Sequence, residues 1–127
     1  MFTNYGKQAI TWAIGSDISN NYISYLAIGS GSGTAVVGDT TLRGEEQRMA
    51  ITGSPDFSTP RKVGFQADFN SIVMSGITLT EFGLIASGTG VVLGSAGLGS
   101  IWQREAFGSI AFDGSNELQI VTTLEVL

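Results

Sequence analysis

The sequence predicts an all-β fold, either an antiparallel β-sandwich or a jelly-roll-like barrel, with one short helix at the N-terminus. Segments that alternate apolar and polar residues recur at intervals of about ten residues, which is typical of antiparallel strands. Turns rich in Gly, Asp and Ser separate these segments, and 18 of the 127 residues are Gly. A clear helical spacing of apolar residues appears only near the N-terminus. A chain of this length fits a single domain over residues 1–127.

The N-terminal helix is expected over about residues 4–16. Tyr5, Ala9 and Trp12 recur at the spacing that places side chains on one face of a helix. Thr3 or Asn4 can cap the start of this helix, and Gly15 can end it. We expect the helix to close one end of the β-core.

The remaining elements are expected to be strands. Val63, Phe65 and Phe69 alternate with polar residues, which predicts a strand with one buried face. The segment 22–28 is apolar on both sides, which indicates a strand that is covered on both faces. We expect strands over residues 20–30, 47–53, 61–70, 76–87, 101–107 and 117–127, and a helical turn within residues 39–47.

The composition excludes several classes of function. The chain has no His and no Cys, so it lacks the commonest general base, the commonest metal ligand and any thiolate. It carries six Lys and Arg and a net charge of −5, which argues against nucleic acid as a partner. No apolar run is long enough to predict a signal peptide or a membrane span. We therefore expect a non-enzymatic protein without cofactor or metal.

The remaining catalytic and metal-binding patterns are weak. A Ser–Lys pair would need Lys7 or Lys62, and Lys62 lies on the polar side of a predicted strand. Glu81 and Glu105 could form a glycosidase pair, but so short a chain offers no obvious sugar cleft. The glycine run 29–33 lacks the Lys of a phosphate loop.

Calcium is the other ion that the sequence leaves open. Asp39, Glu45, Glu46 and Asp113 supply carboxylates, but they lack the spacing of a calcium-binding loop. No residue is therefore assigned to a metal.

Two arginines lie among apolar residues of predicted strands. Arg48 precedes Met49, and Arg104 follows Trp102 by two positions. Either the arginines lie on exposed strand faces, or one is buried and needs a carboxylate, because an unpaired buried charge is costly. Glu81 and Glu105 are the candidate partners for a structural ion pair, within the fold or between subunits.

Two glycine-rich loops, residues 30–38 and 88–100, are the candidate contacts with other proteins. They carry almost no charge and contain apolar side chains, which suit burial against a partner. The contact residues we predict are Val36, Val37, Val91, Val92, Leu93 and Leu98.

Six segments, in this order, resemble a family of small virion proteins of tailed bacteriophages. They are "YLAIGSGSG" (25–33), "DTTLRGEEQRMAI" (39–51), "VGFQADFN" (63–70), "LTEFGLIA" (79–86), "WQREAFGSI" (102–110) and "ELQIVTTLEVL" (117–127). The family is found among fibre, collar, neck and decoration components, and "LTEFGL" is its most specific piece here. The chain departs from the family pattern in the glycine-rich segment 88–100 and at Glu105.

The resemblance implies a non-catalytic β-sandwich that is made in the host cytoplasm and built into a virion, commonly as a homo-oligomer. Its partners would be other virion proteins of the capsid, neck or tail, with no nucleic acid and no membrane. We expect a head decoration or cement protein, a fibre-base component or a component of the tail periphery. The alternative is a receptor- or carbohydrate-binding tip, for which an exposed Trp102 or Tyr22 would supply a stacking platform.

Overall fold

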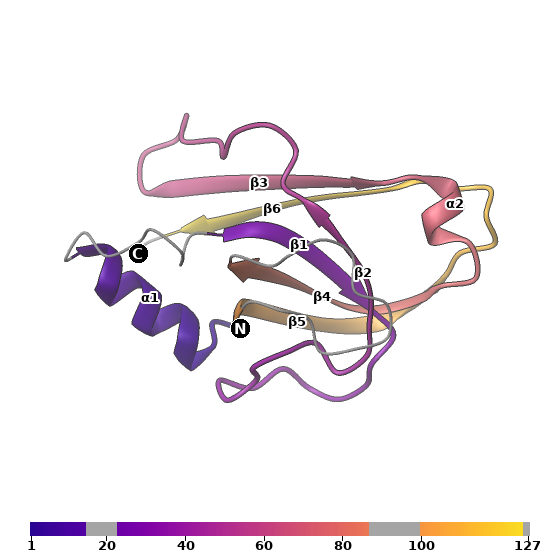
Figure 1. Cartoon of the computed structure of the whole chain (residues 1–127), viewed down its shortest axis with the longest axis horizontal. Helices are drawn as coiled ribbons and strands as arrows, with labels where there is room; N and C mark the ends of the chain where they lie inside the picture. The colour runs from indigo at the N-terminus through magenta and orange to yellow at the C-terminus, as the bar shows by residue number, and fades with distance from the viewer. Residues whose placement is uncertain (15–22, 87–99, 126–127) are drawn as a thin grey trace.

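The computed structural model describes residues 1–14, 23–86 and 100–125, and it shows two antiparallel β-sheets with one short N-terminal helix (Figure 1). The predicted all-β fold of the sandwich type is thereby confirmed. The elements are α1 (Asn4–Ile14), β1 (Ile23–Gly29), β2 (Glu45–Ala50), β3 (Lys62–Phe69), α2 (Ser71–Met74), β4 (Thr78–Ala86), β5 (Ser100–Ala111) and β6 (Leu118–Glu125).

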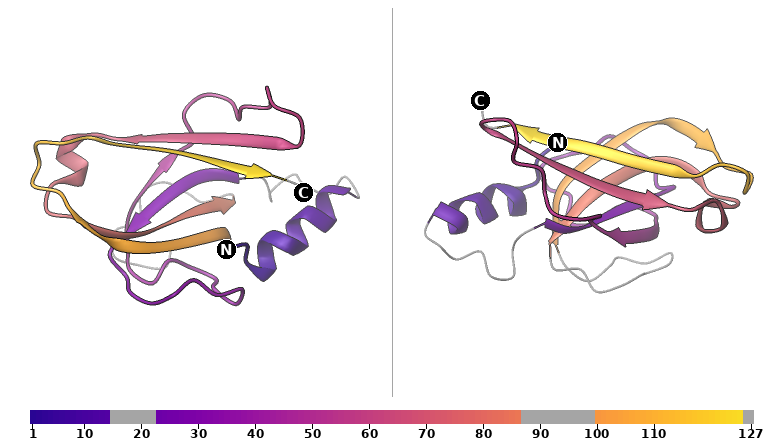
Figure 2. Two further views of the ribbon diagram at one scale, coloured as in Figure 1. Left: turned by 180° about the vertical axis from the view of Figure 1, so that it is seen from behind. Right: turned by 90° about the horizontal axis from the view of Figure 1, so that it is seen from above.

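The two sheets form two layers of unequal width. The larger sheet has the strand order β2-β1-β4-β5, and the smaller one pairs β3 with β6. Every described pairing is antiparallel. Seen from behind and from above, β3 and β6 lie across the larger sheet, and α1 lies at one end of the molecule (Figure 2).

The main core lies between the two sheets. Leu26 and Leu84 of the larger sheet and Phe65 and Phe69 of the smaller one are buried in a single cluster. Full burial of such side chains contributes about 1.5–3 kcal/mol each. On β6, residues at even positions are half-buried and their neighbours are exposed, so the predicted alternation holds.

A second, smaller core lies on the other face of the larger sheet. Residues 30–44, which we call the cover segment, run over this face and place Leu42 against Ala27, Ile85 and Ile101. A Cβ atom at Gly83 would lie 2.7 Å from Cδ1 of Ile101, so a side chain there would crowd the cluster. The central strands β1 and β4 are therefore covered on both faces, as the apolar segment 22–28 predicted.

Two predicted elements differ in the structure, the helical turn within residues 39–47 and the strand over residues 101–107. Helix α1 is described over Asn4–Ile14, and its predicted end at residue 16 lies outside the described part, as do the side chains of Ala9 and Trp12. The helical turn predicted within residues 39–47 is wrong: the chain stays irregular there, because backbone N–H groups of the cover segment bond to a side chain instead, and β2 begins at Glu45.

The short helix α2 was not predicted. Asn70 caps it, since its Oδ1 accepts a hydrogen bond of 2.9 Å from the N–H of Val73. Strand β5 also extends further than residues 101–107, because its pairing with β4 continues as far as Ala111.

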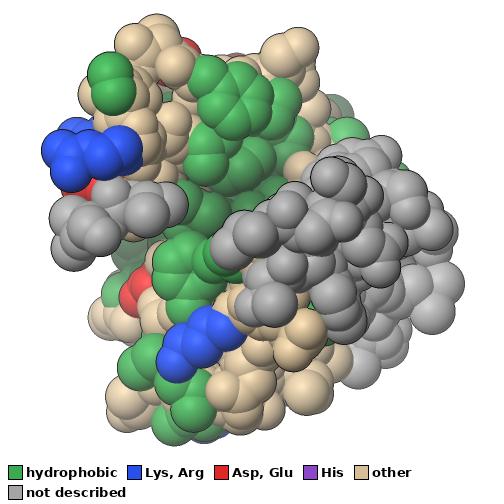
Figure 3. Space-filling view, turned by 90° about the vertical axis from the view of Figure 1, so that its left-hand side faces the viewer, with side chains coloured by type: hydrophobic (Ala, Val, Ile, Leu, Met, Phe, Trp, Pro, Cys, Tyr) green, Lys and Arg blue, Asp and Glu red, His purple; other side chains and the backbone are tan. Residues whose placement is uncertain are grey.

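The end of the molecule beside α1 exposes apolar side chains, with basic side chains next to them (Figure 3). Phe57, in the segment before β3, is 72% exposed there. Among the described residues, no helix has the length and apolar character needed to cross a membrane.

Candidate functional site

A buried ion pair joins β4 and β5 beneath the cover segment. Nε of Arg104 lies 2.8 Å from Oε1 of Glu81, and both side chains are fully buried. The register of the larger sheet places Arg104 opposite Gly83, two residues beyond Glu81 on β4. The structure therefore brings together two of the four residues proposed for a structural ion pair.

Glu81 also holds the backbone of the cover segment. Its Oε1 accepts a hydrogen bond from the N–H of Arg43 at 3.0 Å. Its Oε2 accepts from the N–H groups of Gly31 and Gly44, each at 2.8 Å. Burial raises the pKa of Glu81, but the hydrogen bonds from Arg43, Arg104, Gly44 and Gly31 outweigh it and leave the pKa below its ordinary value. The carboxylate is therefore charged at neutral pH and ties both ends of the cover segment to β4.

Asp39 extends this network to the middle of the cover segment. Its Oδ2 lies 3.3 Å from Nη1 of Arg104, and its Oδ1 lies 3.3 Å from Nη2 of Arg43. Burial raises the pKa of Asp39. The hydrogen bond from the N–H of Val36 and the two arginines lower it by more, so the net pKa lies below the ordinary value.

The two arginines also donate to backbone carbonyl groups. Arg104 donates to the carbonyl of Gly33 at 3.2 Å. Arg43 donates to the carbonyls of Ser32 and Thr34, at 3.2 and 3.0 Å. These hydrogen bonds from Arg104 and Arg43 hold the backbone of the cover segment at Ser32, Gly33 and Thr34.

Arg48 pairs with a residue that the sequence did not suggest. Its Nε and Nη2 lie 2.7 and 2.8 Å from the two carboxylate oxygens of Glu45, and both side chains are buried. Residues three apart on a regular strand point to opposite faces. Here a bulge places Glu46 as an extra residue between the pairs Ile28–Gln47 and Gly29–Glu45, which turns Glu45 to the side of Arg48.

Glu105 takes no part in the two buried pairs of the described chain. It forms an ion pair with the amino group of Met1 at the surface and accepts a hydrogen bond from Gln103. Because it follows Arg104 directly on β5, its side chain points to the opposite face of the strand. Burial raises its pKa, but the amino group and Gln103 lower it more, and the net pKa lies below the ordinary value.

The cover segment presents apolar side chains to solvent. Val36 and Val37 are 46% and 41% exposed, and the N–H of Asn4 donates to the carbonyl of Val37 at 2.8 Å. The other predicted contacts, Val91, Val92, Leu93 and Leu98, lie outside the described residues.

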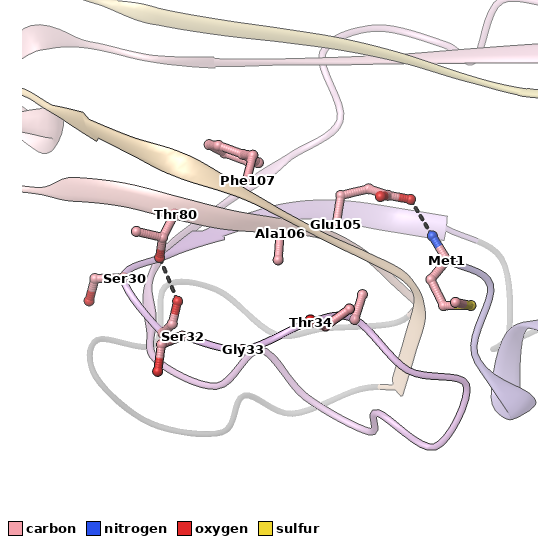
Figure 4. A pocket seen from close by; sticks show the side chains of 11 residues that line it. Met1, Ser30, Ser32, Gly33, Thr34, Thr80, Glu105, Ala106 and Phe107 are labelled. Carbon is pink, nitrogen blue, oxygen red and sulfur yellow. Dashed lines mark hydrogen bonds and ion pairs between the residues drawn. The ribbon is translucent and has the colours of Figure 1, made fainter.

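A pocket of about 660 Å³ lies between the start of the cover segment and β5 (Figure 4). Residues 30–35 form one wall, and Thr80, Ala106 and Phe107 form another. Oγ1 of Thr80 donates to the carbonyl of Gly31 at 2.6 Å and so ties the two walls together. The lining is mainly backbone and small side chains, together with Met1, Glu105 and Phe107.

Trp102 does not offer a stacking platform. It is 8% exposed and belongs to the main core, so it presents no exposed face to a sugar, and its accessible part lines an apolar pocket. Tyr22, the other residue named for such a platform, lies outside the described part.

The described carboxylates are not gathered for metal binding. In the described parts of the chain, no three Asp or Glu side chains come close enough to hold a metal ion. Asp39 and Glu45 are engaged with arginines, Glu46 accepts from the hydroxyl of Ser30, and Asp113 accepts from Ser115. Asp39 and Asp113 also accept hydrogen bonds from the backbone N–H groups of Val36 and Ser115, and so they position backbone.

The sequence offered no signal for Asp39, Arg43 or Glu45 as members of the buried network, because each owes its role to a loop path or a bulge.

Comparison with known proteins adds no identification: no protein-family model matches the chain, and no curated protein matches it.

Proposed function

We propose that this chain is a non-enzymatic structural protein of a bacteriophage virion, which acts by binding neighbouring virion proteins. Its place would be the head surface, the fibre base or the tail periphery. The observation that carries the proposal is the cover segment, where buried charges hold a weakly charged loop in one conformation and leave Val36 and Val37 exposed. A loop that is ordered before binding loses little conformational entropy when a partner covers it.

The segments that carry the family resemblance are the ones that build this loop. Glu81 lies in "LTEFGL", Arg104 in "WQREAFGSI", and Asp39 and Arg43 in "DTTLRGEEQRMAI". Their shared role in holding the cover segment gives a physical reason for these residue types to occur together. This supports a common architecture with the virion proteins that the sequence resembles.

The edge of β5 supports contact with further copies of the chain. Among the described residues, β5 ends the larger sheet, and its residues from Ala106 to Ala111 are exposed. They include Phe107 and Ile110 and carry no charge. Natural edge strands are usually protected by charge or Pro, and an unprotected one is suited to association.

The test measures incorporation into particles of the phage that encodes the chain. Mass spectrometry of gradient-purified particles should find the wild-type chain in a fixed ratio to the major capsid protein. The double variant Val36→Lys, Val37→Lys should be depleted at least tenfold, because two charges would have to be buried at the contact. Ile72→Lys is the matched control, since Ile72 is exposed on α2, away from the cover segment. Absence of the wild-type chain from the particles would overturn the proposal.

A further inference from the structure

An apolar pocket of about 570 Å³ opens at the end of the molecule beside α1, where β3 begins and β6 ends (Figure 3). Its apolar lining comes from Phe2, Ile10, Phe57, Val63, Trp102 and Leu124. A second apolar pocket of about 290 Å³ shares the last four of these residues. Pockets of about 300–1,000 Å³ with such linings are the usual size for ligand binding. The space is sufficient for a large apolar side chain together with the residue beside it.

The charges at the rim of this pocket have the opposite sign to the whole chain. Arg61 and Lys62 line it, with Glu125 as the single carboxylate. Neither Arg61 nor Lys62 forms an ion pair with a described residue, whereas the other three arginines pair with Asp39, Glu45 and Glu81. Among the described residues, two cations without an ion pair face one carboxylate at this rim, and on a chain of net charge −5 this favours an anionic group in the occupant.

The backbone at Arg61 is strained. Residues 59–62 form a turn closed by the N–H of Lys62 and the carbonyl of Thr59, at 3.2 Å, with Pro60 at its second position. Arg61 occupies the third position with φ of 65°, where such turns favour Gly. At every other described position with positive φ the chain has Gly, namely Gly33, Gly53, Gly76 and Gly114. A residue that keeps a strained conformation at the mouth of a pocket points to a use for its side chain.

We propose that this pocket docks a segment of a neighbouring virion protein that carries a large apolar side chain next to a carboxylate. The apolar side chain packs over Trp102 and against Phe57, and the carboxylate faces Arg61 and Lys62. The choice of a protein segment as occupant rests on the proposed function, and the pairing of apolar and anionic groups rests on the pocket and its rim.

The direct test is a titration with short peptides, followed by NMR of the Trp102 indole N–H. A Trp12→Phe variant assigns this signal, because the chain has two Trp. The probe is acetyl-Gly-Phe-Asp-Gly-amide, for which we expect a saturable shift with Kd on the order of 1 mM. The analogue with Ala in place of Phe should bind at least about tenfold more weakly. The analogue with Asn in place of Asp should bind about two- to fivefold more weakly.

Variants of the rim separate binding from folding. Arg61→Gly should raise the melting temperature, because Gly relieves the strain, and should still weaken binding about two- to fivefold. Glu125→Gln should strengthen binding by a similar factor, because it removes the carboxylate that opposes the ligand. If Arg61→Gly raises stability and leaves peptide affinity unchanged, the assignment of Arg61 fails.

Other outcomes overturn the proposal as a whole. No shift of the Trp102 signal with the Phe–Asp peptide, equal affinity for the Asn analogue, or binding of octanoate but of no peptide would each reject a protein segment of this chemistry. The particle experiment is independent of these results. Failure of the peptides with normal incorporation rejects only this pocket, and peptide binding without incorporation rejects the virion role.

Discussion

Glu81 connects three segments that are distant in the sequence. Its carboxylate contacts Arg104 on β5 and the backbone of the cover segment at Gly31, Arg43 and Gly44. A buried carboxylate loses its hydration, and this cost is offset only when each oxygen is well hydrogen-bonded. Here one oxygen accepts two hydrogen bonds and the other accepts from Arg43 and Arg104, so the charge is retained inside the fold.

Removal of the arginine from this pair should be strongly destabilising. Arg104→Met leaves the buried charge of Glu81 without its cation, and we expect a loss of about 3 kcal/mol or more in the free energy of unfolding at pH 7. Urea denaturation followed by circular dichroism measures it. Arg43→Met is the control, because Arg43 is an exposed member of the same network, and it should cost no more than about 1 kcal/mol. Equal losses in the two variants would contradict this account.

The sequence could nominate residues for the network but could not assemble it. Arg104 was a candidate because apolar neighbours on a strand make burial of its charge costly, and Glu81 was one of two acids named for it. Glu45 was missed as the partner of Arg48, since strand alternation separates residues three apart and only the bulge at Glu46 reverses this. Sequence periodicity does not reveal a bulge.

At the scale of elements, the cover segment depends on close approach of two backbone stretches. A Cβ atom at Gly31 would lie 2.3 Å from Oε2 of Glu81 and 2.6 Å from the backbone nitrogen of Gly44. No side chain fits there, so Gly at this position lets both stretches reach the same carboxylate. The glycine run 29–33 is held in place by that contact.

Gly31→Ala should therefore displace the cover segment. We expect a cost of about 1–3 kcal/mol, the usual range for overpacking, because backbone must move to admit the methyl group. Gly38→Ala in the same segment is the matched control: its φ is not positive and no described atom lies within 4 Å of a Cβ placed there. It should be neutral or slightly stabilising. Thermal denaturation of both variants, with NMR of the Gly44 amide, provides the comparison.

Strands β3 and β6 were predictable because each has one buried face, which leaves a period-two pattern, whereas β1 was predictable as an apolar run covered on both faces. Val63, Phe65 and Phe69 on β3 show this pattern, as do the half-buried residues of β6. The helical turn expected within residues 39–47 does not form, and Asp39 accepts hydrogen bonds from Val36 and from two arginines. Tertiary contacts overrode the local preference there, and α2 was missed because four residues are too few to show periodicity.

At the scale of the whole molecule, the two sheets differ in how much protection they give their strands. Strands β1 and β4 lie inside the larger sheet and are covered by the smaller sheet on one face and by the cover segment on the other. Strand β6 ends the smaller sheet, and its inward residues are only half-buried. A two-stranded sheet is marginal without further support, so β6 should be the weaker part of the fold.

Native-state hydrogen exchange in low concentrations of urea should resolve this difference. Amides of β4 should exchange only through global unfolding, with a steep dependence on urea, because their opening exposes both cores. Amides of β6 that bond to β3 should exchange through a smaller opening, with a lower free energy and a shallow dependence on urea. Exchange of both strands with the same free energy and slope would mean that the sheets open as one unit. A separate opening of β6 would instead leave the larger sheet and its cover segment folded. The surface that we assign to assembly, with Val36 and Val37, would then stay intact while the smaller sheet opens.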